Sequence, residues 1–108
     1  MKPQLKYGII ETFVLSILTH GESYGYKIVY DLSNYIEISE STLYPILRRL
    51  EVSKAIISRN EIFSGRNRKY YKITTIGEAK IDEFMKDWQD IRKISEILIK
   101  RGKQNEFN

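Results

Sequence analysis

The alternation of apolar and polar residues predicts two helices in the first third of the chain. From Leu5 to Leu18, apolar residues recur with the spacing of one broad helix face. His20-Gly21 follows as a stop signal of the kind found at the carboxyl end of a helix. Ser23 can cap a second helix, and residues 36–39 then form a turn. This part of the chain therefore predicts a helical scaffold that leads into a third helix.

Residues 39–51 predict that third helix. Its apolar positions follow the i, i+3, i+4, i+7 spacing of a buried stripe, and they are Leu43, Ile46, Leu47 and Leu50. Pro45 has no N–H, and its ring would crowd the carbonyl of Ser41 if the helix already existed there. Either the helix begins late or its first turn is distorted, and both alternatives stay open.

A hairpin is expected next. Residues 55–63 and 69–74 are rich in Ile, Tyr, Phe and Thr, and residues 64–68, Ser-Gly-Arg-Asn-Arg, form a loop with hairpin chemistry. Helix, turn, helix and then hairpin is the order of a winged helix-turn-helix domain. The fold expected is therefore mainly α with a small β-hairpin.

The last third predicts one long helix. Thr74 or Thr75 can cap it, and no proline interrupts it as far as Lys100. One side carries residues in alternating steps of three and four, namely Ile81, Phe84, Trp88, Ile91, Ser95 and Leu98. A helix of about 26 residues is roughly 39 Å long, which is more than a compact domain of this size can cover. The stripe therefore predicts a homodimer, with an interface at Ile81, Phe84, Trp88, Ile91 and Leu98.

The positive charge of the chain is concentrated on the hairpin. The formal charge is −1 over residues 1–52, +5 over residues 53–72 and 0 over residues 73–108, which together give the net charge of +4. The loop and second strand carry Arg66, Arg68, Lys69 and Lys72 without an acid among them. Such a run is often only a solvated face. A basic hairpin that directly follows a helix with polar side chains is also typical of the wing of a winged helix, which binds DNA phosphates.

The polar side of the third helix is suited to nucleic acid. It displays Ser41, Tyr44, Pro45, Arg48 and Arg49, and the hydroxyl and guanidinium groups among them bond phosphate oxygens and guanine edges. A short helix fits the major groove of double-stranded DNA. An ordinary surface helix is the alternative, and the basic hairpin that follows favours the DNA-reading interpretation.

The composition of the chain excludes several classes of protein and several kinds of site. The chain of 108 residues has room for one modest core, and its lack of cysteine excludes a disulfide framework and a cysteine-ligated zinc. No apolar run is long enough to span a membrane, so we expect a cytoplasmic protein. His20 is the only histidine and no glycine-rich phosphate loop occurs, so neither an enzyme nor a cofactor or metal site is expected. Four tyrosines are expected to be packing residues with a polar end toward water, namely Tyr24, Tyr26, Tyr30 and Tyr35.

Two segments carry a family resemblance. Residues 43–51 read Leu-Tyr-Pro-Ile-Leu-Arg-Arg-Leu-Glu, and residues 65–77 read Gly-Arg-Asn-Arg-Lys-Tyr-Tyr-Lys-Ile-Thr-Thr-Ile-Gly. Together with Ser-Tyr-Gly-Tyr at 23–26, they resemble the signature of the PadR-like transcriptional regulators, and the resemblance extends over roughly residues 5–100. It implies a dimeric winged-helix repressor that leaves its DNA operator when a small molecule binds.

The resemblance also assigns site residues. It places Ser41, Thr42, Tyr44 and Arg48 on the reading helix, and Arg66, Arg68 and Lys69 on the wing. This chain departs from the family pattern at Lys54-Ala55, where the family usually has glycine and then leucine. A non-glycine residue in a left-handed helix cap costs about 1 kcal/mol, so a different helix ending is expected here.

Trp88 has two interpretations. As an aromatic side chain in a helix pair, it contributes buried apolar area. Alternatively, two copies of Trp88 bracket a cavity at the dimer interface and stack on a planar aromatic or cationic compound, with Phe84 and Ile91 as further wall residues. The resemblance extends to multidrug-sensing members of the family, which have a tryptophan at the matching place.

These observations predict a division of the chain and a function. Residues 1–74 would form the DNA-binding domain, residues 75–100 the dimerisation helix, and residues 101–108 an unstructured tail. The leading hypothesis is a DNA-binding repressor released by a ligand. The alternative is a dimeric ligand- or protein-interaction module that has the winged fold but controls no promoter.

Overall fold

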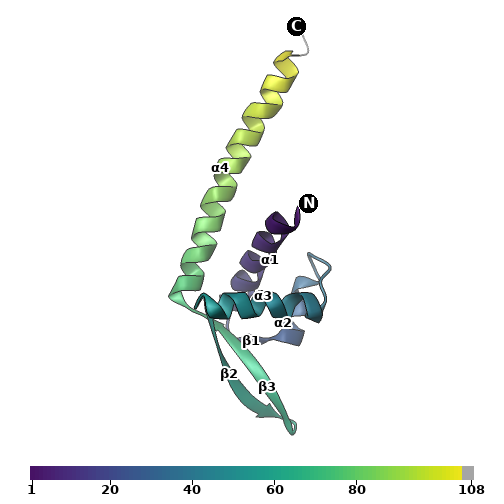
Figure 1. The fold of residues 1–108 in the computed structure, drawn as a ribbon, viewed down its shortest axis with the longest axis vertical. Coiled ribbons are helices and arrows are strands. Elements are labelled where there is room, and N and C mark those ends of the chain that lie inside the picture. Colours follow the sequence, from purple (N-terminus) through teal and green to yellow (C-terminus); the bar gives the residue numbers. More distant parts are fainter. Residues whose placement is uncertain (106–108) are drawn as a thin grey trace.

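The computed structural model describes residues 1–105, with the elements in the predicted order (Figure 1). They are α1 (Pro3–Leu18), β1 (Ser23–Tyr24), α2 (Gly25–Leu32), α3 (Glu40–Val52), β2 (Ile56–Phe63), β3 (Arg66–Ile73) and α4 (Thr75–Asn105). The first three helices cluster together, the hairpin extends away from them on one side, and α4 extends on the other. The two-residue strand β1 was not predicted from the sequence.

The core lies between the three short helices and the base of the sheet. All four residues of the predicted α3 stripe are buried, together with residues of α1, α2, β2 and β3. The largest fully buried side chains are Val14, Leu15, Leu18, Ile28, Leu32, Leu43, Ile46, Leu47, Leu50 and Ile56. The apolar side of α3 is therefore turned inward, which leaves its polar side on the surface.

The start of α3 decides between the two alternatives for Pro45. Ser39 is the N-cap, and its hydroxyl oxygen accepts a hydrogen bond from the backbone N–H of Thr42 at 3.3 Å. The helix begins at Glu40, so Pro45 lies inside it and a late start is excluded.

The end of α3 corrects one expectation. Lys54 adopts the left-handed conformation with φ of 64°, and its N–H donates to the carbonyl of Glu51 at 3.0 Å. The N–H of Ala55 donates to the carbonyl of Leu50 at 2.9 Å. These two bonds form a Schellman motif, the usual glycine-type ending, with lysine in the glycine position. The predicted different ending was wrong because the two bonds hold Lys54 in this conformation in spite of its Cβ.

Thr74 joins the sheet to α4. Its Oγ1 accepts from the N–H of Gly77 at 3.2 Å, so Thr74 caps the helix, and its hydroxyl donates to the carbonyl of Lys54 at 2.6 Å. Its N–H donates to the carbonyl of Ala55 at 3.0 Å. One residue therefore connects the end of α3 with the start of α4.

The sheet has the strand order β1-β3-β2, and both pairings are antiparallel. Phe63 pairs with Arg66 across a two-residue turn, in which Ser64 and Gly65 have φ of 49° and 76°. Positive φ at both positions is typical of a type I′ turn, whose twist lets the strands pair up to the turn itself. The expected five-residue loop at 64–68 is therefore mostly strand, and Arg66 and Arg68 belong to β3.

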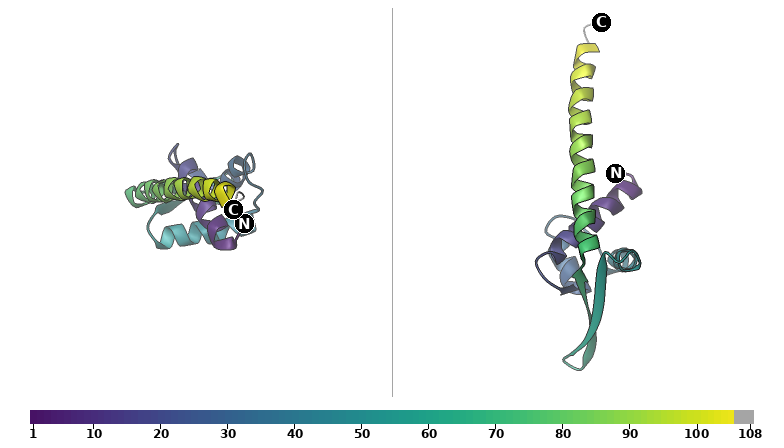
Figure 2. Two further views of the ribbon diagram at one scale, coloured as in Figure 1. Left: turned by 90° about the horizontal axis from the view of Figure 1, so that it is seen from above. Right: turned by 90° about the vertical axis from the view of Figure 1, so that its left-hand side faces the viewer.

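Helix α4 is longer than predicted. It continues past Lys100 to Asn105, so residues 101–105 are helical where a tail was expected, because nothing in this polar segment breaks the helix. The rest of the predicted tail, residues 106–108, lies outside the described residues. The carboxyl half of α4 extends beyond every other element (Figure 2). Among residues 1–105, no helix is long and apolar enough to cross a membrane.

Candidate nucleic-acid interface

The exposed side of α3 carries the predicted reading residues. Ser41, Thr42, Tyr44 and Arg48 are all exposed. The hydroxyls of Ser41 and Thr42 lie 2.9 and 3.1 Å from Oγ of Ser39. The first turn of α3 therefore presents three hydroxyl groups side by side, each able to donate or accept a hydrogen bond.

Tyr44 is oriented by contacts on both sides. Its hydroxyl donates to Oε2 of Glu40 at 3.4 Å. Its ring lies against the backbone of Gly25 at the start of α2, where a Cβ would come within 2.7 Å of the Tyr44 hydroxyl oxygen. Partial burial raises the pKa of Tyr44, and the negative charge of Glu40 makes a smaller contribution in the same direction. Tyr44 is therefore a neutral hydroxyl group at neutral pH, held in place on the exposed side of α3.

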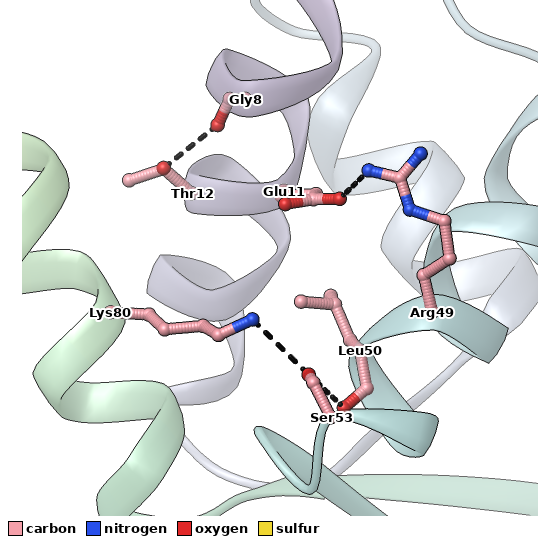
Figure 3. Close-up of polar contacts among 7 residues, drawn as sticks. All are labelled: Gly8, Glu11, Thr12, Arg49, Leu50, Ser53 and Lys80. Atoms are coloured by element: carbon pink, nitrogen blue, oxygen red, sulfur yellow. Dashed lines mark hydrogen bonds and ion pairs between the residues drawn. The ribbon is translucent and has the colours of Figure 1, made fainter.

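The two adjacent arginines of α3 differ in their contacts. Arg49 forms an ion pair with Glu11 of α1 (Figure 3), and its guanidinium carbon lies 5.3 Å from the ring centroid of Tyr7. Arg48 is exposed and has no ion-pair partner within residues 1–105. Arg48 is therefore the arginine of α3 that is available to an external anion.

The wing arginines also occupy different environments. Arg66 is exposed at the turn. The guanidinium carbon of Arg68 lies 4.0 Å from the ring centroid of Tyr24 and 4.2 Å from that of Phe63. Neither arginine has an acidic partner in the part of the chain that is described. Both therefore keep their positive charge uncompensated.

Lys69 is tied to α3. Its Nζ lies 3.3 Å from Oε1 of Glu51, whose other carboxylate oxygen accepts a hydrogen bond from the hydroxyl of Ser58 at 2.6 Å. The hydrogen bond from Ser58 holds the pKa of Glu51 below its ordinary value, and Lys69 makes a smaller contribution in the same direction. Lys69 therefore contributes less free charge than its place in the sequence suggests.

Arg59 is similarly compensated. It donates to Glu22 at 2.6 and 3.0 Å and to Glu61 at 2.8 Å, and this raises its own pKa and lowers that of Glu22. The hairpin's surplus of positive charge is thus carried mainly by Arg66, Arg68 and Lys72. Sequence patterning missed this because Glu22 and Glu51 are 37 and 18 residues away in the chain from their partners Arg59 and Lys69.

The structure brings several predicted residues into one groove. Tyr44 of α3 and Arg66, Arg68 and Lys69 of the wing line it together. Arg48 lies in an adjoining hollow, which also includes Tyr44 and Lys69. Ser41 and Thr42 lie outside both hollows, on the exposed first turn of α3.

Sequence reasoning missed Tyr26, which also lines this groove. The expectation of a packing residue was wrong here, because 67% of the surface of Tyr26 is exposed. The only signal in the sequence was its place in the Ser-Tyr-Gly-Tyr segment.

The predicted stripe of α4 divides into two parts. Ile81 packs against the core, and Phe84 is half-buried beside α1. Trp88 stacks on Phe84 with ring centroids 6.4 Å apart, and 40% of its surface is exposed. Beyond Trp88 nothing in residues 1–105 covers the helix, and half or more of each large apolar side chain is exposed at Ile91, Ile94, Ile97, Leu98 and Ile99.

Comparisons with known proteins agree with this architecture. Residues 14–83 match the model of the family described as the transcriptional regulator PadR-like family. The transcriptional regulator Rv3488 of Mycobacterium tuberculosis is 36% identical over 73 residues, which span 64% of this chain and 68% of that protein.

Solved structures show the same fold. A PadR-like transcriptional regulator from Bacillus cereus aligns with a TM-score of 0.74 at 31% identity, covering 89% of this chain and 96% of that one. PadR of Bacillus subtilis in complex with operator DNA aligns with a TM-score of 0.67 at 23% identity, covering 71% of this chain and 46% of that one. The predicted winged-helix fold and the predicted family resemblance are confirmed.

Proposed function

The chain belongs to the PadR-like family of transcriptional regulators, which bind DNA, and from this premise we propose that it is a dimeric repressor released by a small ligand. In this proposal residues 1–74 form the DNA-binding domain and α4 is the dimerisation helix. One observation carries the DNA-binding part: uncompensated Arg48, Arg66 and Arg68 lie on the reading helix and the wing, around the groove that Tyr44 lines.

The reading helix is proposed to enter the major groove. Ser41, Thr42, Tyr44 and Arg48 would face the bases and the nearest phosphates, and Arg66, Arg68 and Lys69 would contact the phosphates beside them. The B. subtilis protein, whose fold is similar, was solved with operator DNA bound, which supports a winged helix of this kind as a DNA-binding unit.

The dimer is proposed to form through α4. The uncovered side chains from Ile91 to Ile99 form a continuous apolar surface on an otherwise polar helix. Water contact at such a surface is unfavourable, and a second α4 with the same pattern can cover it by two-fold symmetry. Trp88, Ile91 and Leu98 would lie in this interface, whereas Ile81 and Phe84, also predicted there, already pack on the core and on α1 of the same chain. Two reading helices could then bind half-sites about 34 Å apart on one face of DNA.

The effector is proposed to bind next to Trp88. The exposed indole, backed by Phe84 and followed by Ile91, provides a flat apolar platform at the proposed dimer interface. A planar aromatic or cationic compound could stack between two such platforms. Its binding would change the angle between the two halves, and the arrangement that matches DNA would become less populated.

A gel-shift titration tests the proposal. The probe is the DNA upstream of the protein's own gene, with and without a planar cationic dye. With three uncompensated arginines per protomer on phosphates, the log–log slope of affinity against salt should be about −5. The double variant with Arg66→Ala and Arg68→Ala should lose DNA binding, but the dye should still quench the fluorescence of Trp88. Unchanged DNA affinity in this variant would show that the assignment of Arg66 and Arg68 to a DNA-contacting wing is wrong.

A further inference from the structure

Arg68 is the only wing cation in the described part of the chain that lies between two aromatic rings. The ring centroids of Tyr24 and Phe63 are 4.0 and 4.2 Å from its guanidinium carbon, well within the range of cation–π attraction. Arg68 is half-buried, while Arg66 at the turn is exposed and has no aromatic contact of this kind. The two wing arginines therefore differ in how freely they move before any partner binds.

Strand register explains why these three side chains meet. Phe63 pairs with Arg66, and Arg68 lies two residues further along β3 on the same face, so Phe63 and Arg68 are diagonal neighbours. On the other side of β3, Tyr24 pairs with Tyr70, which is again two residues from Arg68 on that face. One ring thus comes from each strand that flanks β3. We call Tyr24, Arg68 and Phe63 the arginine stack.

The arginine stack fixes the guanidinium without neutralising it. A ring that attracts the guanidinium by cation–π contact offers it no carboxylate oxygen, so its N–H donors are not taken up by an acid as those of Arg59 are. Arg59 shows the contrasting arrangement, because its donors are occupied by Glu22 and Glu61. An arginine ordered in advance loses less side-chain entropy when it binds an anion than a freely moving one.

We propose that Tyr24 and Phe63 are positioning residues, which hold Arg68 as a pre-oriented donor to a phosphate of the DNA backbone. This inference rests on the proposed DNA-binding function and deepens it. Tyr24 directly precedes α2, so the same contact sets the direction of the wing relative to the helices. Arg68 therefore contributes more to DNA affinity than the unstacked Arg66.

A double-mutant cycle on DNA tests the proposal. Phe63 is 53% exposed, so Phe63→Leu should fold normally. We expect Phe63→Leu to weaken operator binding about 5- to 10-fold, and Phe63→Tyr to remain close to the unmodified protein. In an Arg68→Ala background, Phe63→Leu should change affinity less than about 2-fold, because there is no guanidinium left to position. An equal effect of Phe63→Leu in both backgrounds would overturn the proposal.

The salt dependence supplies a readout that a purely structural role would not change. Arg68→Ala should reduce the magnitude of the log–log salt slope by about 0.9 for each phosphate that the side chain no longer neutralises. Arg68→Lys should keep the slope but lose affinity, because a compact ammonium does not stack as a planar guanidinium does. An unchanged slope in Arg68→Ala means that Arg68 contacts no phosphate, and the proposal is then wrong.

Nuclear magnetic resonance of the free protein separates the arginine stack from DNA binding. The side-chain protons of Arg68 should be shifted upfield by the two rings and should move toward ordinary values in Phe63→Leu. Ile62→Ala, in the same strand but on its opposite face, is the matched control and should keep the upfield shift of the Arg68 protons unchanged. Ordinary values in the unmodified protein would overturn the inference. Shifted protons without any operator binding would leave the stack in place and refute the proposed function instead.

Discussion

Arg49 of α3 forms an ion pair with Glu11 of α1, and this contact fastens the reading helix to the helix behind it (Figure 3). A second contact lies at the end of α3, where Nζ of Lys80 in α4 donates to Oγ of Ser53 at 3.2 Å. The reading helix is thus attached to both α1 and α4.

Replacing Arg48 and Arg49 one at a time distinguishes a residue that contacts DNA from one that holds α3 against α1. Arg48→Ala should weaken operator binding at least 10-fold and reduce the magnitude of the salt slope by about 0.9 for each phosphate that Arg48 neutralises. Arg49→Ala should leave that slope unchanged and lower the free energy of unfolding by less than about 1 kcal/mol, because the Arg49 side chain of this ion pair is 59% exposed. Equal slopes for the two variants would contradict the assignment of Arg48.

Lys54→Gly should stabilise the protein. Lys54 has φ of 64°, a conformation that glycine adopts without the steric penalty of a Cβ. The free energy of unfolding, measured with urea at fixed protein concentration, should rise by about 1 kcal/mol. Lys54→Ala is the control for loss of the side chain and should show no such gain. A loss of stability in Lys54→Gly would mean that the lysine side chain matters more than the backbone.

Gly77→Ala should destabilise the junction between the sheet and α4. A Cβ at this position would lie 2.3 Å from the backbone carbonyl oxygen of Ala55, which cannot move without disturbing the end of α3. We expect a loss of roughly 1–3 kcal/mol in the free energy of unfolding. Gly102→Ala, in the same helix, meets nothing within 4 Å and should be neutral or stabilising. Similar effects of both substitutions would show that helix propensity outweighs this contact.

Glu51 should make stability depend on pH. Its pKa lies below the ordinary value of 4.5 because the Ser58 hydroxyl and Lys69 favour the ionised carboxylate in the folded chain. This contribution is present above pH 4.5 and is lost as the pH falls through the lower pKa of the folded protein. Glu51→Gln should therefore be less stable than the unmodified protein at pH 7, and the difference should shrink as the pH falls below 4.5.

Denaturant unfolding at several pH values measures this difference. Glu37→Gln, at an exposed site with no ion pair within residues 1–105, is the control for removal of a negative charge. A difference between Glu51→Gln and the unmodified protein that persists unchanged to pH 3 would contradict the role of the Glu51 charge.

Local patterns predicted the elements well because each depends on neighbours in the chain. The stripe from Leu43 to Leu50 is buried as its spacing required, and Thr74 caps α4 as its position suggested. The predicted ends of the helices and strands were less accurate. The type I′ turn at Ser64-Gly65 allowed β3 to begin at Arg66, and β1 is too short to produce a pattern of its own.

The sequence by itself determined the helices, the hairpin and the exposure of Ser41, Tyr44 and Arg48, because periodicity decides which face of a helix avoids water. Only the tertiary structure decided which cations keep their charge available. Glu11, Glu22 and Glu51 reach Arg49, Arg59 and Lys69 from distant segments, while Arg68 lies between two rings. Such pairings depend on packing in three dimensions, which the spacing of residues along the chain does not record.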